Sequence, residues 1–367
     1  MDDGDLALAG GSIRSTAALA HAVEDATRLA TSTLQDLLVE RAVRAGRHAD
    51  AARVLWEDLA STLGGKLMRP RLTAAAYLGL GGTDLGAVAP VAAAQEVLHV
   101  AMLVHDDVLD HDDVRRGRLN VSGAARRRGL TRGLPAVDAD AQALAAGILA
   151  GDLALASAFR LVARTPVPGD VRERLTDLLA DGVETAVAGE LLDVASETLA
   201  PADVDALLVA ALKTAEYSCR VPLASGAVLA GADEDVLRRL DDVAAALGLA
   251  FQLTDDDLGV FGDPAVTGKS VLSDLRRGKR TELLRVAYDR SGPAGRATLD
   301  RYVGQPDLDE EGAALVRAVM VDSGALAAVR TLVARTARAA REHARALPEP
   351  LADYLVGVVD DLVGRGH

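Results

Sequence analysis

Two aspartate-rich segments, about 150 residues apart, constrain this chain more than any other feature of its sequence. The first reads HDDVLDHDDVRRG over residues 105–117, and the second reads FQLTDDDLGVFGD over residues 251–263. Asp106 and Asp110 are four residues apart, so on a helix they lie on one face, a turn apart. The apolar run VLHVAMLV leads directly into them. Carboxylates at the end of an apolar helix face need a compensating cation. Mg²⁺ fits this need because it takes oxygen ligands and usually binds protein carboxylates and substrate phosphates at the same time.

Composition favours one large helical domain. The chain has 367 residues, half of them hydrophobic, and β-branched alternation is scarce. No linker rich in Pro, Gly or Ser interrupts its middle, so we expect a loose N-terminal tail over residues 1–15 and a single all-α domain over 16–367. Helices are predicted at about 16–44 and 49–62, followed by a helix with Pro70 in its first turn that ends at Gly79–Gly82, and by a long helix, capped by Thr83 or Asp84, that carries the first acidic segment. An exposed Arg- and Gly-rich loop is predicted at 122–137, a break at Pro222 and a loop at 262–280. Further helices are predicted at about 138–163, 170–196, 202–218 and 223–230, from Asp233 to the second acidic segment, and at 281–291, 294–302, 308–321, 324–346 and 350–364.

Charge and cysteine usage exclude several classes of partner. The net charge of −14 argues against nucleic acid. The one cysteine, Cys219, permits no internal disulfide, which suits a cytoplasmic location, and we expect it to be a small buried residue. No apolar run approaches the length of a membrane span, so no stable membrane insertion is expected. The N-terminal sequence MDDGDLALAGG is acidic where a signal peptide is basic.

Basic residues accompany the two acidic segments. The sequence GGKLMRP is expected to place its lysine and arginine on one helical turn after a flexible diglycine. Acid pairs together with several cations are what two diphosphate groups require, because a metal ion bridges carboxylate and phosphate while Lys and Arg neutralise the remaining oxygens. Each piece alone is weak, since an acidic helix face or an Arg pair is usually solvated surface. The basic residues concerned are Lys66, Arg69, Arg115, Arg116, Lys213, Lys269 and Lys279.

Seven strings in a fixed order carry a resemblance to a known family. They are GGKLMRP (64–70), EVLHVAMLVHDDVLDHDDVRRG (96–117), GILAGDLAL (147–155), GELLD (189–193), KTAEYS (213–218), FQLTDDDLG (251–259) and TGKSVLSDLRRGKRT (267–281). As a set they resemble the trans-isoprenyl diphosphate synthases, or polyprenyl synthetase family, and in particular its bacterial geranylgeranyl diphosphate synthases. The resemblance implies an all-α isoprenoid-synthase bundle around a central cavity, a homodimer, and three Mg²⁺ ions per active site.

The resemblance also implies an activity and a role for each matching residue. The enzyme would be a Mg²⁺-dependent prenyltransferase that condenses isopentenyl diphosphate with an allylic diphosphate into an all-trans prenyl diphosphate. Metal binding would fall to Asp106, Asp107, Asp110, Asp255 and Asp256. The allylic diphosphate would be bound by Arg115, Lys213, Lys269 and Lys279, and isopentenyl diphosphate by Lys66, Arg69, His99 and Arg116. Lys213, Thr214 and Gln252 would act at the reacting carbons, the last two by presenting oxygen dipoles to the developing carbocation.

The second acidic segment departs from the family pattern at one position. The family usually has a carboxylate at the fifth position, where this chain has Gly259. The first aspartate, Asp255, is kept. Asp257 lies about 200° around the helix from it, so it is not expected to substitute and is predicted to be a helix-surface charge.

Product length depends on the residues just upstream of Asp106. Shorter-chain members of the family commonly have an aromatic side chain four or five residues before this aspartate. Here those positions are Met102 and Ala101. Since one helical turn rises about 5.4 Å, close to one isoprene unit, we expect a product of C20 or longer, with geranylgeranyl diphosphate first. The alternative is that Ala101 only packs against a neighbouring residue and that other residues close the end of the cavity and limit product length.

Other functions remain open at this point. A farnesyl or a longer polyprenyl diphosphate synthase would use the same residues. A class I terpene cyclase would need an aromatic lining for its cations, but the chain has only three Phe, five Tyr and one Trp. A non-catalytic synthase subunit tends to lose the acidic segments, which are present here. A purely structural helical protein would leave the ordered acids and bases unexplained.

Overall fold

The computed structural model describes residues 13–263 and 271–364, and these residues are almost entirely helical. The packing of the chain divides it into two compact units. Unit 1 comprises Met1–Leu179 and Val221–Asp233, and unit 2 comprises Ala180–Arg220 and Glu234–His367. The all-α prediction is confirmed. The expectation of a single domain over 16–367 stays a prediction.

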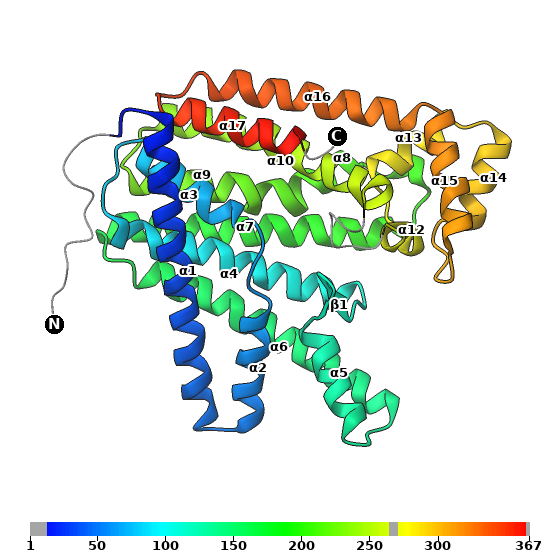
Figure 1. The fold of residues 1–367 in the computed structure, drawn as a ribbon, viewed down its shortest axis with the longest axis horizontal. Coiled ribbons are helices and arrows are strands. Elements are labelled where there is room, and N and C mark those ends of the chain that lie inside the picture. Colours follow the sequence, from blue (N-terminus) through cyan, green and yellow to red (C-terminus); the bar gives the residue numbers. More distant parts are fainter. Residues whose placement is uncertain (1–12, 264–270, 365–367) are drawn as a thin grey trace. The chain divides into compact units, whose positions relative to one another are not determined.

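Unit 1 is built around α4 (Leu85–Leu109), which packs against α1, α3, α6 and α9. Its length follows from its caps and composition: the Asp84 carboxylate accepts from the Gly86 and Ala87 amides, and a run of Ala, Val and Leu is buried on nearly every side. Gln95 also donates to Ser225 on α9 (3.1 Å). The remaining helices, which Figure 1 shows in blue to green, are α1 (Thr16–Gly46), α2 (Asp50–Ser61), α3 (Met68–Gly79), α5 (Val121–Thr131), α6 (Ala136–Ala163), the first part of α7 (Gly169–Ser196) and α9 (Val221–Leu229).

Helix α5 lies where the sequence predicts an exposed loop, so that prediction is wrong. Asn120 caps the helix by accepting from the Gly123 amide (2.8 Å). The arginines have carboxylate partners from elsewhere in the unit: Arg126 pairs with Asp113 and Arg128 with Asp58. Because these partners are distant in sequence, the local Arg and Gly content concealed a helix.

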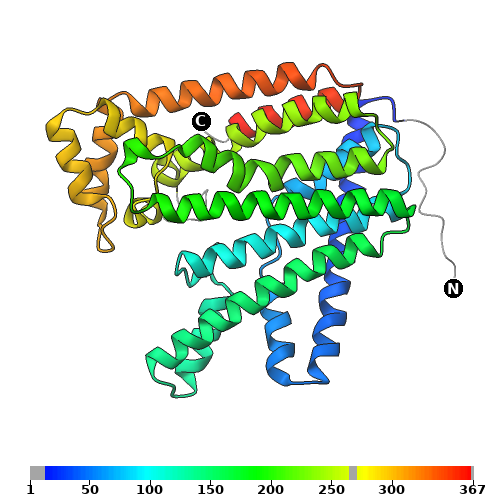
Figure 2. The same cartoon turned by 180° about the vertical axis from the view of Figure 1, so that it is seen from behind.

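Unit 2 is built around α10 (Glu234–Phe261), which packs against α16 and the segment Ala211–Arg220. Figure 2 shows α16 running alongside α10 in the C-terminal half of the chain. The other elements of the unit are the rest of α7, a 3₁₀ turn η1 (Pro201–Asp203), α8 (Ala206–Ala210), η2 (Ala211–Arg220), α12 (Ser273–Arg277), α13 (Glu282–Arg290), α14 (Pro293–Tyr302), α15 (Glu310–Asp322), α16 (Ala325–Ala344) and α17 (Leu351–Val363).

Segment η2 is a π-helix of ten residues rather than part of an α-helix. The predicted break at Pro222 is therefore wrong: the chain changes from π to α winding at Val221 and continues as α9. Proline lacks the N–H that would bond to the preceding turn, so the change of winding at this point costs no hydrogen bond from it. Wide π turns inside helices occur frequently at functional sites.

Asp257 corrects a second expectation, because it is not a helix-surface charge. Its side chain is 9% exposed and accepts from Arg330 on α16, at 2.8 Å from Nε and 3.3 Å from Nη2. Asp255 is exposed, and Asp257 lies on another side of α10 as predicted. That side of α10 faces α16 rather than solvent. The carboxylate joins α10 to α16.

Two described helices meet the length and composition of a membrane span, so the expectation that no apolar run approaches that length is wrong. They are α4, whose apolar window is 78% buried inside the protein, and α6, whose window is 44% buried. The bent pair α15 and α16, with 66° between its helices, passes the same test only when counted as one span. For α4 the packing of unit 1 accounts for the composition, since a helix buried all round is apolar all round.

Removing the Arg330 guanidinium should destabilise the protein through Asp257. In Arg330→Ala the buried carboxylate loses its bidentate partner, and we expect a loss of about 1–3 kcal/mol in the free energy of unfolding, measured by urea titration. Arg338→Ala, at an exposed position on the same helix, is the control and should change stability by less than about 0.5 kcal/mol. Equal effects of the two substitutions would show that the ion pair is unimportant.

Candidate functional site

The first acidic segment lies at the C-terminal end of α4. The helix ends at Leu109, and Asp110 is its C-cap, whose amide donates to the Asp106 carbonyl (2.8 Å). The end of a helix carries partial negative charge, so carboxylates there are disfavoured unless a cation is near. Asp107 is 3% exposed, and its burial raises the pKa of its carboxyl to about 6 although the Arg115 guanidinium opposes the shift. The place where these acids lie thus favours binding of a cation.

A tight hairpin returns the chain to these acids. Strand β1 (Val114–Arg115) pairs with β2 (Arg118–Leu119), and both residues of the turn, Arg116 and Gly117, have positive φ values of 53° and 70°. Two positive φ angles are typical of the turns that match the twist of a hairpin. As a result Arg115 reaches Asp107 from Nε (2.7 Å) and Asp106 from Nη2 (2.9 Å). One predicted diphosphate ligand and two predicted metal ligands therefore lie together.

The turn of the hairpin meets the GGK loop of the same unit. Arg116 donates from Nη1 to the Gly64 carbonyl (2.7 Å), and its guanidinium lies against Gly65. Gly64, Gly65 and Leu67 all have positive φ, so the loop is wound left-handed before α3 begins at Met68. Lys66 lies in this loop rather than on the helical turn with Arg69, so the prediction of a shared turn is wrong.

Glu96 joins the cations of this loop, and sequence reasoning gave it no role. Its side chain on α4 is buried, and burial raises the pKa of its carboxyl while the charges of Arg69 and Arg116 act in the opposite direction. Glu96 also lines a cavity of about 110 Å³ with Gly64 and Leu67. The sequence does contain a signal for Glu96, because it precedes the predicted ligand His99 by three residues and so lies near it on the same helix. Unit 1 thus gathers Arg69, Arg116 and Glu96 at one place.

The second acidic segment lies near the C-terminal end of α10 in unit 2. Asp255 is exposed, whereas Asp256 is buried and accepts from Gln252 Nε2 (2.7 Å). Burial raises the pKa of Asp256 to about 6, against the opposing charge of Lys279. This bond uses the amide nitrogen of Gln252 and fixes the orientation of the amide, so its carbonyl oxygen is directed away from Asp256.

Lys213 lies on the π-helix η2 between two carboxylates of α7. Its Nζ is 2.8 Å from Glu190 Oε2 and 2.7 Å from Asp193 Oδ2. Gly189 makes this approach possible, because a Cβ at that position would lie under 3.0 Å from the Lys213 amide nitrogen. Thr214 follows in the same π turn. The GELLD string therefore supplies two acidic partners to a predicted diphosphate-binding lysine, a role that the string alone did not indicate.

Lys279 completes the basic set of unit 2. The charges that act on Lys279 are the carboxylates of Asp274, Asp256 and Asp193 and the ammonium of Lys213. Burial alone would lower the pKa of Lys279, but the three carboxylates outweigh burial and raise its pKa above the ordinary value. Lys269, the remaining predicted ligand of the allylic diphosphate, lies outside the described residues.

Each unit supplies carboxylates that suit Mg²⁺, although neither supplies a complete set of ligands among its described residues. All the candidate ligands are carboxylate oxygens, which Mg²⁺ prefers, and Arg115 and Lys279 supply positive charge near them. Among the described residues no three His, Cys, Asp or Glu side chains are grouped closely enough to form a metal site by themselves. Mg²⁺ in phosphate chemistry commonly takes only one or two carboxylates and completes its coordination with water and phosphate oxygens.

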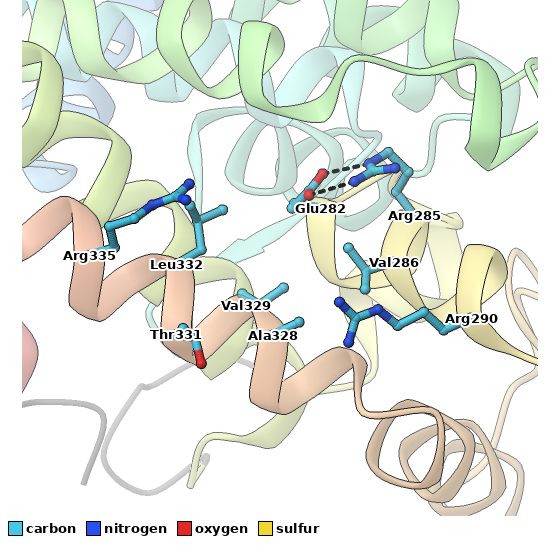
Figure 3. Close-up of a pocket in the computed structure, with 9 residues that line it drawn as sticks. All are labelled: Glu282, Arg285, Val286, Arg290, Ala328, Val329, Thr331, Leu332 and Arg335. Carbon is cyan, nitrogen blue, oxygen red and sulfur yellow. Dashed lines mark hydrogen bonds and ion pairs between the residues drawn. The ribbon is translucent and has the colours of Figure 1, made fainter.

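The chain-length candidates lie one turn before the acids on α4. Ala101 is fully buried, and Met102 is partly exposed. A separate pocket of about 260 Å³ lies between α13 and α16, and none of its lining residues is a predicted site residue. Figure 3 shows its arginines, with Arg285 paired to Glu282 on α13 and Arg335 on α16.

Comparisons with known proteins agree with this chemistry. A family model described as polyprenyl synthetase matches residues 55–320. The geranylfarnesyl diphosphate synthase of Aeropyrum pernix is 36% identical over 271 residues, which cover 72% of this chain and 77% of the relative. The (2E,6E)-farnesyl diphosphate synthase of Mycobacterium tuberculosis is 33% identical over 270 residues, which cover 71% of this chain and 68% of the relative.

A solved structure gives the same result for the fold. Geranylgeranyl pyrophosphate synthase from Corynebacterium glutamicum, crystallised with isoprenyl diphosphate and magnesium, matches with a TM-score of 0.88 and 28% identity, covering 94% of this chain and 99% of that one. The chain belongs to the polyprenyl synthetase family and is a prenyltransferase, a trans-isoprenyl diphosphate synthase that condenses isopentenyl diphosphate.

Proposed function

We propose that this enzyme extends an allylic diphosphate to an all-trans prenyl diphosphate of C20 or longer, with geranylgeranyl diphosphate as the first product, in a Mg²⁺-dependent reaction. The observation that carries the proposal is the pairing of Arg115 with Asp106 and Asp107 at the negative end of α4. Carboxylates and a guanidinium in contact there form a place for a metal-bound diphosphate, because each group compensates a different part of its charge.

The allylic diphosphate is bound by cations from both acidic regions in this proposal. Asp106, Asp110 and Asp255 would hold the Mg²⁺ ions directly, and Asp107 and Asp256 would support them from buried positions. When bound, Mg²⁺ neutralises negative charge as it develops on the leaving diphosphate. The cationic ligands of that diphosphate are Arg115, Lys213, Lys269 and Lys279. The contacts of Lys213 with Glu190 and Asp193 support this role, since they hold its ammonium in place before substrate arrives.

Isopentenyl diphosphate is bound by Lys66, Arg69, His99 and Arg116. The positive φ angles of the GGK loop support this assignment, because left-handed loops allow the backbone to approach a phosphate closely. Glu96 balances the charges of Arg69 and Arg116 when the site is empty of anion.

The reacting carbons face oxygen dipoles rather than a charged base. Ionisation of the allylic ester leaves a carbocation, which the double bond of isopentenyl diphosphate attacks. The carbonyl of Gln252, oriented by the bond to Asp256, and the hydroxyl of Thr214 stabilise that cation. The departing diphosphate accepts the proton that is then lost, so no His or Glu general base is required.

Product analysis tests the proposal directly. With Mg²⁺, isopentenyl diphosphate and a series of allylic primers, mass spectrometry should show prenyl diphosphates of C20 or longer, and chelation with EDTA should abolish them. Products formed from an allylic diphosphate alone would contradict condensation and favour a cyclase. Asp255→Asn should lower the rate by about 10²-fold or more, because a lost charge-stabilising ligand typically costs that much.

The residues before Asp106 set product length in this proposal. A phenylalanine at Met102, which is partly exposed, should shorten the product by about one isoprene unit, because one helical turn spans about 5.4 Å. Ala101→Phe should act in the same direction, although this position is fully buried. Unchanged chain lengths in both variants would remove these positions from the account and leave the floor of the cavity elsewhere.

We also propose that the enzyme is a cytoplasmic homodimer. An exposed apolar face on α6 supports the dimer: Leu144, Ile148 and Leu149 are each more than 40% exposed. Cys219 is the one cysteine of the sequence, and a chain that can form no internal disulfide suits a reducing compartment.

Charged substitutions on α6 test the dimer. The double variant Leu144→Glu and Ile148→Glu should elute as a monomer by light scattering, because two carboxylates would be buried without partners in the interface. Val321→Glu, at an exposed apolar position on α15, is the control and should leave the mass unchanged. A wild-type protein that is itself monomeric would contradict the proposal.

A further inference from the structure

The pocket between α13 and α16 shares no residue with the site described above. Both of its walls belong to unit 2. The strings that resemble the family end at residue 281, and the family model ends at residue 320. The α16 wall, which begins at Ala325, therefore lies beyond the part of the chain that the family pattern covers.

The pocket carries an excess of positive charge. Among the described residues that line it, three arginines and one glutamate are charged. Glu282 accepts from Arg285 through both oxygens, at 2.7 and 2.8 Å, so these two charges compensate each other. Arg290 donates to the Gly324 carbonyl (3.3 Å) and, like Arg335, has no carboxylate partner in the part of the chain that the structure describes. Two positive charges are thus left uncompensated in a chain whose net charge is −14.

The inner wall of the pocket is apolar. Val286 of α13 and Val329 of α16 are buried in the core of the unit, and Leu332 packs against that core. Figure 3 shows the Arg290 side chain extending from α13 toward α16 over this wall. From Ala328 to Leu332 the helix rises about 6 Å, which is close to the length of one isoprene unit.

The volume of the pocket limits the ligand to a small molecule. About 260 Å³ is roughly the room of eight or nine water molecules in the liquid. Pockets for drug-sized ligands have about 300–1,000 Å³. A long prenyl chain is therefore too large, whereas a five-carbon group suits the apolar wall with its charged end at the mouth, where Arg290 and Arg335 are exposed.

We propose that this pocket is a second binding site, independent of metal, for an organic diphosphate with a short apolar group, the chemical class to which isopentenyl diphosphate belongs. Two guanidinium groups without acidic partners match the two or more negative charges of a diphosphate, whereas a monocarboxylate would neutralise only one of them. The one lining carboxylate, Glu282, is already bound to Arg285, so the pocket offers no acid to a metal ion. The inference goes beyond the proposed function, because no residue of this pocket takes part in the reaction.

Hydrogen exchange measured by mass spectrometry tests the site, because it locates protection along the chain. The full chain is titrated with dimethylallyl diphosphate in the presence of EDTA, so that metal-dependent binding does not contribute. The amides of residues 282–290 and 325–335 should become protected together, since the ligand bridges α13 and α16. Inorganic diphosphate, which lacks the apolar group, should need at least about a ten-fold higher concentration for the same protection.

Three substitutions separate the charge of the pocket from its shape. Arg290→Gln and Arg335→Gln should each raise the concentration for half-protection about ten-fold, because each removes one charge-assisted contact. Ala328→Phe fills the pocket without changing its charge and should abolish the protection. Arg338→Gln, at an exposed position of α16 that does not line the pocket, is the matched control and should behave as the wild type does.

The same titrations contain the outcomes that would overturn the inference. Unchanged exchange of both segments in the wild type, or undiminished protection in both arginine variants, would do so. Equal protection by inorganic diphosphate would overturn the ligand class, and protection by phosphatidic acid vesicles but not by the soluble diphosphate would assign the pocket to a lipid headgroup instead. If Ala328→Phe does not fold, the two arginine variants decide the matter, because both positions are exposed. The proposed function is judged separately, by whether the wild type makes prenyl diphosphates at all.

Discussion

The need to compensate negative charge near the C-terminal ends of two long helices, α4 and α10, governs the chemistry of this protein. The first acidic segment closes α4, where the helix dipole adds to the charge of its carboxylates. Asp107 and Asp256 are buried as well, which makes the ionised form of each costly, and the pKa of each is raised to about 6. Such sites are stable only beside cations. The protein supplies Arg115 in unit 1 and Lys279 in unit 2, and a metal ion is the cation that substrate chemistry adds.

The same charges give the basic residues two sets of partners. Arg115 now binds Asp106 and Asp107, and Lys213 binds Glu190 and Asp193. In the proposed reaction, the oxygens of a diphosphate would compete for these cations, and the carboxylates would then be available to hold a metal ion. Binding would be an exchange of ionic partners among groups that are already partly buried, so little side-chain ordering would remain to be done. The internal pairs preorganise the site for a second, stronger partner.

Sequence reasoning predicted the helical class and most helices because their apolar periodicity is local. It failed where a distant partner decides the outcome. The sequence predicts a loop where α5 lies, because Asp58, the partner of Arg128, is 70 residues away. It predicts a surface charge at Asp257, because Arg330 is 73 residues away. The hairpin that carries Arg115 and the left-handed loop that carries Lys66 depend on backbone angles that no periodicity reveals.

The predicted site residues followed a similar rule. The motifs supplied candidates for the groups that bind substrate, but they assigned no role to three acids that lie within the strings 96–117 and 189–193. The structure places Glu190 and Asp193 in contact with Lys213, and it places Glu96 where the charges of Arg69 and Arg116 act on it. Such supporting acids become visible from sequence only when a lysine or arginine is already known to be buried nearby.

The central claim is that carboxylates from both acidic segments bind the metal ions of one diphosphate. Crystals grown with Mn²⁺ and inorganic diphosphate test it most directly, because anomalous scattering locates each ion. The account predicts ions coordinated by Asp106 and Asp110 and a further ion coordinated by Asp255, all of them sharing oxygens of the same diphosphate. Ions bound by one segment alone, or two segments that bind separate diphosphates, would contradict it.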